Sequence, residues 1–180
     1  EKEVELEIVK KWDELDVCKD LELVENQHSM SKGQLDILAK ASDGEVLIEL
    51  KHDNDRSATM QLITYIHSKK MSGVKIKEGW LIVGNITPRI LYPILEHNEY
   101  NPIKIKLFQW DFNSEFNKLS GRGKGFGLYE YMAPLDIYKK GLLSDGFAVE
   151  YYGGNKDALE AAHMKNKEIL IEKGLLSADE

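Results

Sequence analysis

Asp36, Glu49 and Lys51 have side chains that can carry out hydrolytic chemistry together if the chain brings them to one place. Asp36 lies in an alternating segment, and Glu49 and Lys51 lie two positions apart in the next one. Asp43-Gly44 stands between the segments and is a common signal for a tight turn between antiparallel strands. We therefore expect a β-hairpin here.

The expected register of this hairpin, over residues 34–51, decides whether the three side chains meet. With Asp43-Gly44 as the two turn residues, Asp36 faces Lys51, and strand alternation puts Glu49 on the same side. The other side carries only apolar side chains and must face the core: Leu35, Ile37, Ala39, Val46, Ile48 and Leu50.

Two carboxylates and an ammonium on one sheet face suit a divalent cation. Mg²⁺ takes one or two carboxylates and completes its shell with water and phosphate. The metal acidifies a bound water. The lysine can position that water, help to deprotonate it, or stabilise the charge on a reacting phosphorus. The alternative is a surface ion pair of Lys51 with Asp36 or Glu49, which is common and weak.

The next expected element is a helix over about residues 57–72, and it adds two polar side chains. Gln61 and Tyr65 are four residues apart, so they lie on one helix face. Both can hydrogen-bond a phosphate or a metal-bound water. The alternative is an ordinary amphipathic helix, with Tyr65 half-buried and Gln61 solvated.

These segments together resemble a known nuclease family. The segments Gly33-Gln-Leu-Asp36-Ile-Leu-Ala, Gly44-Glu-Val-Leu-Ile-Glu49-Leu-Lys51 and Gln61-Leu-Ile-Thr-Tyr65 are similar to the PD-(D/E)xK nuclease superfamily. The order of the motifs resembles its RecB-like branch, and most of all the catalytic domain of the NucS/EndoMS mismatch endonucleases. The likeness covers roughly residues 1–85.

The resemblance implies a fold and a set of roles. The fold is α/β, a restriction-endonuclease-like core with a mixed central β-sheet flanked by helices. Asp36 and Glu49 would be the metal ligands, with the Leu50 carbonyl as a third. Lys51 would be the catalytic lysine, and Gln61 and Tyr65 would be auxiliary catalytic residues.

The family also places an acidic residue on the first helix, which we expect over residues 3–15. Val4, Ile8 and Trp12 follow helical spacing there. Glu3 fits the acidic position best, with Glu7 as the fallback and Glu5 also open.

Further elements are expected along the chain, in an organisation of two parts. We expect strands over 20–26, 80–83 and 103–109, helices over 88–97 and 155–173, and a glycine-rich loop over 120–127. Residues 1–127 would form the nuclease-like core. Residues 128–180 would be a C-terminal extension, packed on the core, whose role the sequence does not indicate.

The composition limits the class of protein. The chain has 180 residues, of which 42% are hydrophobic and 31% charged, which is typical of a globular protein. Its apolar runs are too short for a transmembrane helix. The lone Cys18 cannot form an internal disulfide, so we expect a cytoplasmic protein.

The charge is unevenly distributed. The net charge is −9 over residues 1–55, +6 over 56–127 and −4 over 128–180. Arg122 and Lys124 lie in the glycine-rich loop of the basic segment, and we expect them to contact nucleic acid; a flexible linker is the alternative.

The function expected is that of a Mg²⁺-dependent DNA endonuclease, with Mn²⁺ able to substitute. Restriction, repair and mismatch or junction cleavage all fit. The partner would be DNA, with a homodimer left open. The alternative is a catalytically inactive module of the same fold that binds nucleic acid or a protein. The target, and DNA as against RNA, do not follow from the sequence.

Overall fold

The computed structural model describes the chain except for residues 32, 53–56, 113–125, 132–167, 169–170 and 173–180. The chain divides into two compact units, Glu1–Trp110 and Asp111–Glu180. In the second unit the described strand is β6 (Gly127–Glu130), and Glu168, Ile171 and Glu172 are helical. The expected loop at 120–127 and helix at 155–173 lie almost wholly outside the described residues, and the boundary expected at residue 127 stays a prediction.

The first unit is an α/β fold built on a mixed sheet. Its strands lie side by side in sequence order, β1 to β5. β1, β2 and β3 are antiparallel neighbours, whereas β3, β4 and β5 run parallel. The elements are α1 (Lys2–Lys10), 3-10 turns at Trp12–Glu14 and Asp16–Cys18, β1 (Glu22–Met30), β2 (Gly33–Ala41), β3 (Gly44–Lys51), α2 (Ser57–Met71), β4 (Ile76–Val83), α3 (Pro88–Tyr100) and β5 (Lys104–Asp111).

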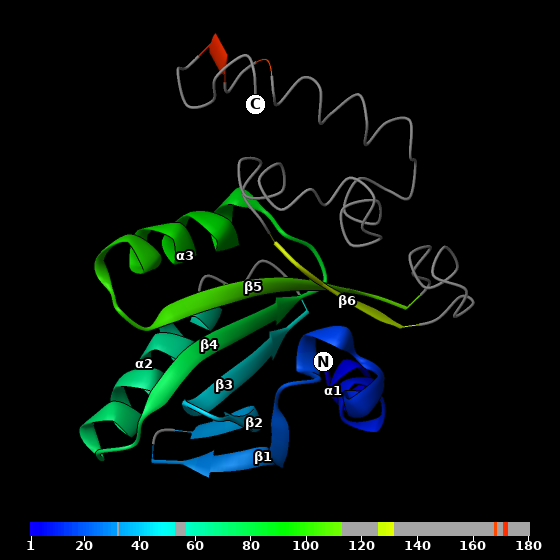
Figure 1. The fold of residues 1–180 in the computed structure, drawn as a ribbon, viewed down its shortest axis with the longest axis vertical. Helices are drawn as coiled ribbons and strands as arrows, with labels where there is room; N and C mark the ends of the chain where they lie inside the picture. Colours follow the sequence, from blue (N-terminus) through cyan, green and yellow to red (C-terminus); the bar gives the residue numbers. More distant parts are fainter. Residues whose placement is uncertain (32, 53–56, 113–125, 132–167, 169–170, 173–180) are drawn as a thin grey trace. The chain divides into compact units, whose positions relative to one another are not determined.

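Helices cover both faces of this sheet. α2 and α3 lie together on one side of it, and α1 lies on the other (Figure 1). α2 packs closely on β4, because a Cβ atom at Gly79 would lie only 2.8 Å from Cδ1 of Ile66. The expectation of a mixed sheet flanked by helices is therefore confirmed.

The hairpin of β2 and β3 is confirmed, but its expected register is wrong by two residues. Lys40 pairs with Glu45, and Ala41 with Gly44, so Ser42 and Asp43 form the turn. Gly44 belongs to β3 because the chain entering β4 packs against it. A Cβ atom at Gly44 would lie 2.8 Å from the backbone nitrogen of Lys77.

A shift of two residues keeps every side chain on its expected face, since alternation has a period of two. The apolar side chains assigned to the core face are all fully buried: Leu35, Ile37, Ala39, Val46, Ile48 and Leu50. Continued by one residue beyond the last pair, Ile37 with Ile48, the observed register sets Asp36 opposite Glu49 rather than opposite Lys51.

Candidate active site

β2 and β3 stop pairing with each other where the candidate site begins. Their ladder ends at Ile37 and Ile48. Beyond this point the backbone N–H of Leu50 donates to Oδ2 of Asp36, at 2.7 Å. The aspartate thus satisfies a donor that the end of the ladder leaves free, and its carboxylate is fixed beside β3.

Glu49 is the most unusual acidic residue of the described structure. Its side chain is 1% exposed, and Oε1 lies 3.2 Å from Nζ of Lys51. Oε2 is buried and has no hydrogen-bond partner in the described part of the chain. The buried Oε2 of Glu45 also makes no hydrogen bond, but it lies 3.0 Å from Nζ of Lys69. A buried carboxylate oxygen without a hydrogen-bond partner is costly, so the ion pair with Lys51 compensates the burial of Glu49 only in part.

The electrostatics of the three side chains reflect this crowding. Burial, followed by the nearby Asp36 charge, raises the pKa of Glu49 to about 7, although Lys51 opposes the shift. Burial also raises the pKa of Asp36, against the hydrogen bond from Leu50. Burial alone would lower the pKa of Lys51, but the Glu49 carboxylate outweighs it and the pKa is raised. Lys51 is therefore a cation at neutral pH.

Gln61 and Tyr65 lie together on α2, as expected, and contact the start of β2. The Gln61 side-chain amide donates to the Tyr65 hydroxyl at 2.9 Å, and that hydroxyl donates to the Gln34 carbonyl at 3.2 Å. Tyr65 is buried rather than half-exposed. Gln34 lies two residues before Asp36, so the pair supports the strand that carries the aspartate.

The acidic residues of α1 differ sharply in their surroundings. Glu3 is exposed, and Glu7 pairs with Lys11 at 3.5 Å. Glu5 is 6% exposed, and its charge acts on Asp36. The structure therefore favours Glu5 over Glu3 as the first-helix acid. Helical spacing holds the signal, because Glu5 falls beside the buried Val4 stripe whereas Glu3 falls away from it.

Sequence reasoning missed a further acidic neighbour and the residues that hold Glu5. Oε1 of Glu1 accepts the backbone N–H of His52 at 3.1 Å, and its charge acts on Asp36 and Lys51. Asn26 and Gln27 of β1 donate to the Glu5 carboxylate. Amides on an exposed edge strand have no sequence pattern that would single them out.

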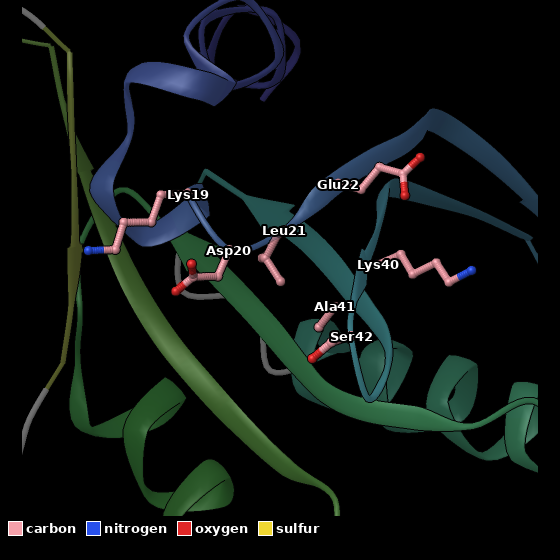
Figure 2. Close-up of a pocket in the computed structure, with 7 residues that line it drawn as sticks. All are labelled: Lys19, Asp20, Leu21, Glu22, Lys40, Ala41 and Ser42. Carbon is pink, nitrogen blue, oxygen red and sulfur yellow. The ribbon is translucent and has the colours of Figure 1, made fainter.

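A depression of about 480 Å³ lies elsewhere, at the start of β1 and the end of β2 (Figure 2). Its charged side chains do not converge, since Lys19 and Lys40 point away from each other. Its lining is Lys19, Asp20, Leu21, Glu22, Lys40, Ala41 and Ser42. We assign it no chemistry.

The remaining chemical groups are less informative. Cys18 is buried, which raises its pKa to about 12, so it is no nucleophile. His52 stacks at a tilt on Trp110, with ring centroids 6.1 Å apart. Arg122 and Lys124 lie outside the described residues. Within the described residues, no helix combines the length and apolarity needed to cross a bilayer.

The chain is similar to several solved structures. The EndoMS–dsDNA2 complex matches 59% of this chain and 44% of its own, at 18% identity and a TM-score of 0.46. A repair endonuclease from Pyrococcus abyssi matches 58% and 46%, at 19% identity and a TM-score of 0.45. The small subunit of the heterodimeric restriction endonuclease R.BspD6I matches 92% and 88%, at 14% identity and a TM-score of 0.42.

The first two matches show how the lengths compare. This chain covers less than half of the EndoMS chain and of the Pyrococcus abyssi endonuclease chain. No protein-family model matches the chain, and the comparison with curated proteins finds no match.

Proposed function

We propose that this protein is a metal-dependent endonuclease that hydrolyses phosphodiester bonds in DNA, with Asp36 and Glu49 as ligands of Mg²⁺ or Mn²⁺. The observation that carries the proposal is the buried Glu49 carboxylate, whose Oε2 lacks a partner in the described structure. Its neighbour across the end of the hairpin is a second carboxylate. Lys51 supplies one positive charge for these two carboxylates, and a divalent cation would balance the charge that remains.

The donor set fits a hard cation. Carboxylate oxygens are the ligands that Mg²⁺ and Mn²⁺ favour, and Mg²⁺ needs only one or two of them. Among the described residues, no three His, Cys, Asp or Glu side chains gather as a metal site. The direct ligands that we propose are Asp36, Glu49 and, by the motif, the Leu50 carbonyl; Glu5, whose charge acts on Asp36, lies outside this set. A bound cation there would acidify a water and neutralise charge on a phosphate.

Lys51 supplies a fixed positive charge at the same place. Its ammonium lies 3.2 Å from Oε1 of Glu49, which holds the flexible lysine stem in one orientation. The side chain remains 18% exposed, so it can meet a phosphate from solvent. Because its pKa is raised, Lys51 is suited to stabilise developing negative charge rather than to remove a proton.

DNA is supported as the substrate by sequence chemistry. The motifs of Asp36, Glu49, Lys51, Gln61 and Tyr65 resemble those of DNA nucleases. The part of the chain that follows the hairpin is basic, with a net charge of +6 over residues 56–127. Cations in such a segment favour a phosphate backbone.

A nicking assay tests this function. Supercoiled plasmid is incubated with the protein in EDTA, Mg²⁺, Mn²⁺ or Ca²⁺. We expect nicked or linear product with Mg²⁺ and Mn²⁺, none with EDTA, and none when Asp36→Asn replaces the wild type. Plasmid binding without cleavage in any metal would instead indicate a non-catalytic module of this fold.

A further inference from the structure

Glu5 is held by neutral donors rather than by a cation. Nδ2 of Asn26 donates to its Oε1 at 3.3 Å, and Nε2 of Gln27 donates to its Oε2 at 2.5 Å. No ion pair of the described structure includes Glu5, although its side chain is 6% exposed. Two amides on β1 thus fix the direction of a buried acid on α1.

Gln27 holds Glu5 from an unfavourable backbone. Its φ of 55° is the only positive value among the described residues that are not glycine. Such a conformation costs free energy for a residue with a Cβ atom, and it persists only where the surroundings impose it. Asn26 pairs with Ile37 and His28 with Leu35, so the distortion lies directly across from Asp36.

Gln34 stabilises this distortion from the neighbouring strand. Its side-chain amide donates to the Gln27 carbonyl at 2.9 Å, while its own carbonyl accepts the Tyr65 hydroxyl at 3.2 Å. Hydrogen bonds therefore connect Gln61 and Tyr65 on α2, through Gln34 and Gln27, to Glu5 on α1. Gln27, in the middle of this chain of contacts, is opposite Asp36 in the strand register.

We propose that Gln27 is a positioning residue of the metal site: its side-chain amide, presented from the left-handed backbone, holds the Glu5 carboxylate beside Asp36. The inference rests on the proposed function. Asn26 is the second donor, and Gln34 fixes the Gln27 backbone.

Two substitutions of Gln27 separate positioning from folding. Gln27→Met removes the donor and keeps the size, whereas Gln27→Gly removes the donor and suits a positive φ. Mn²⁺ affinity is measured by titration calorimetry, and Tm is measured without metal. We expect both variants to bind Mn²⁺ about 10-fold more weakly, by analogy with other partners of metal ligands. Tm should be higher for Gln27→Gly than for Gln27→Met.

A double variant and a matched control complete the test. If Gln27 acts through Glu5, the loss in Glu5→Gln/Gln27→Met equals the loss in Glu5→Gln alone. Ser29→Ala, at an exposed position of β1, should bind Mn²⁺ as the wild type does. Unchanged Mn²⁺ affinity in both Gln27 variants, with wild-type binding intact, would overturn the positioning role alone. A wild type that binds no Mn²⁺ and cleaves no DNA would overturn the proposed function and this inference with it.

Discussion

Asp36 replaces a backbone acceptor for Leu50, because its Oδ2 takes the Leu50 N–H at 2.7 Å where the pairing of β2 with β3 has ended. The residue before Leu50 is Glu49. One hydrogen bond thus holds the Asp36 carboxylate against the backbone of β3, next to Glu49. Because the Asp36 side chain is already held in place, less conformational entropy is lost when a cation binds. The disadvantage is that two negative charges lie close together in the metal-free protein.

Glu49 is buried close to the negative charge of Asp36, so the folded protein should be more stable when Glu49 is neutral, and stability should therefore depend on pH. Its pKa is about 7 in the folded protein against 4.5 for the free side chain, so the folded state binds the proton more tightly. Metal-free stability should therefore fall as pH rises from about 4.5 through about 7, by about 3 kcal/mol at most. Glu49→Gln removes this titration, and its Tm relative to wild type should rise over that window.

Thermal unfolding in EDTA, measured across this pH range, checks the effect. Glu45→Gln is the matched control, because Glu45 lies on the same strand but pairs with Lys69. The control should not show the rise. A Tm difference for Glu49→Gln that is independent of pH would mean that Glu49 is not crowded as described.

Asp36 should tolerate an amide but not a truncation. Asp36→Asn retains an oxygen that can accept the Leu50 N–H and removes a negative charge beside Glu49, so Tm should not fall while Mn²⁺ binding is lost. Asp36→Ala leaves that N–H without its acceptor and should cost about 1–3 kcal/mol of unfolding free energy. Denaturant unfolding and calorimetry measure the two effects, with Asp43→Asn at the exposed turn as the control. Equal stability of the Ala and Asn variants would argue against the hydrogen bond.

Lys51 should affect turnover more than DNA binding. Lys51→Met keeps the apolar stem and removes the charge, and we expect single-turnover cleavage to fall about 10²-fold, as when one electrostatic stabiliser is removed. DNA affinity in Ca²⁺ should change far less. Lys106→Met, which breaks the 3.2 Å ion pair with Glu78 on the neighbouring strands, is the control. If Lys51→Met cleaves at the wild-type rate, Lys51 only forms an ion pair with Glu49 and has no role in catalysis.

Gly33 and Tyr65 should be coupled. Gly33 has a φ of 137°, and a Cβ atom there would lie 2.6 Å from the Tyr65 hydroxyl oxygen. Gly33→Ala should cost about 1–3 kcal/mol, and Tyr65→Phe alone about 1 kcal/mol for the missing hydrogen bond. In the Gly33→Ala background, Tyr65→Phe should cost less unfolding free energy than it does in the wild type, because it removes the hydroxyl that would clash with the added Cβ atom. Strict additivity in a denaturant-unfolding cycle would contradict the close approach of these two residues.

Arg122 and Lys124 give a prediction that rests on sequence alone. Replacing both with Ala should weaken the binding of all DNA sequences alike. It should also reduce the slope of log K against log[salt] by up to about 0.9 for each duplex phosphate that the protein no longer neutralises. Binding of Asp36→Asn in Ca²⁺ across a salt series measures this. An unchanged salt slope would indicate that Arg122 and Lys124 do not contact DNA and that their segment only links the neighbouring parts of the chain.

The face of the hairpin could be predicted from sequence, whereas its register could not. Strand alternation alone put Asp36, Glu49 and Lys51 on one side and the apolar residues in the core. The turn depended on Gly44, a residue with two uses. Its Asp-Gly signal indicated a turn, but the structure uses Gly44 where the chain approaches too closely for a side chain. That close approach is a tertiary contact, which local sequence does not encode.

The first-helix acid shows a different limit. The expected helix over residues 3–15 ends at Lys10, and Trp12 lies in a 3-10 turn, although it is buried as Val4 and Ile8 are. On the shorter helix, Glu5 lies at the edge of the stripe formed by Val4 and Ile8. The distortion at Gln27 could not be anticipated at all, since it arises from contacts with Glu5 and Gln34 on other elements.

The most direct test of the two-carboxylate site is Mn²⁺ titration of the wild type, Asp36→Asn, Glu49→Gln and the control Glu45→Gln, with plasmid cleavage by the same samples. We predict that the wild type and the control bind Mn²⁺ and cut DNA, and that the two site variants, although folded, do neither. Metal binding and cleavage that survive in folded Glu49→Gln would contradict the assignment of Glu49 as a metal ligand.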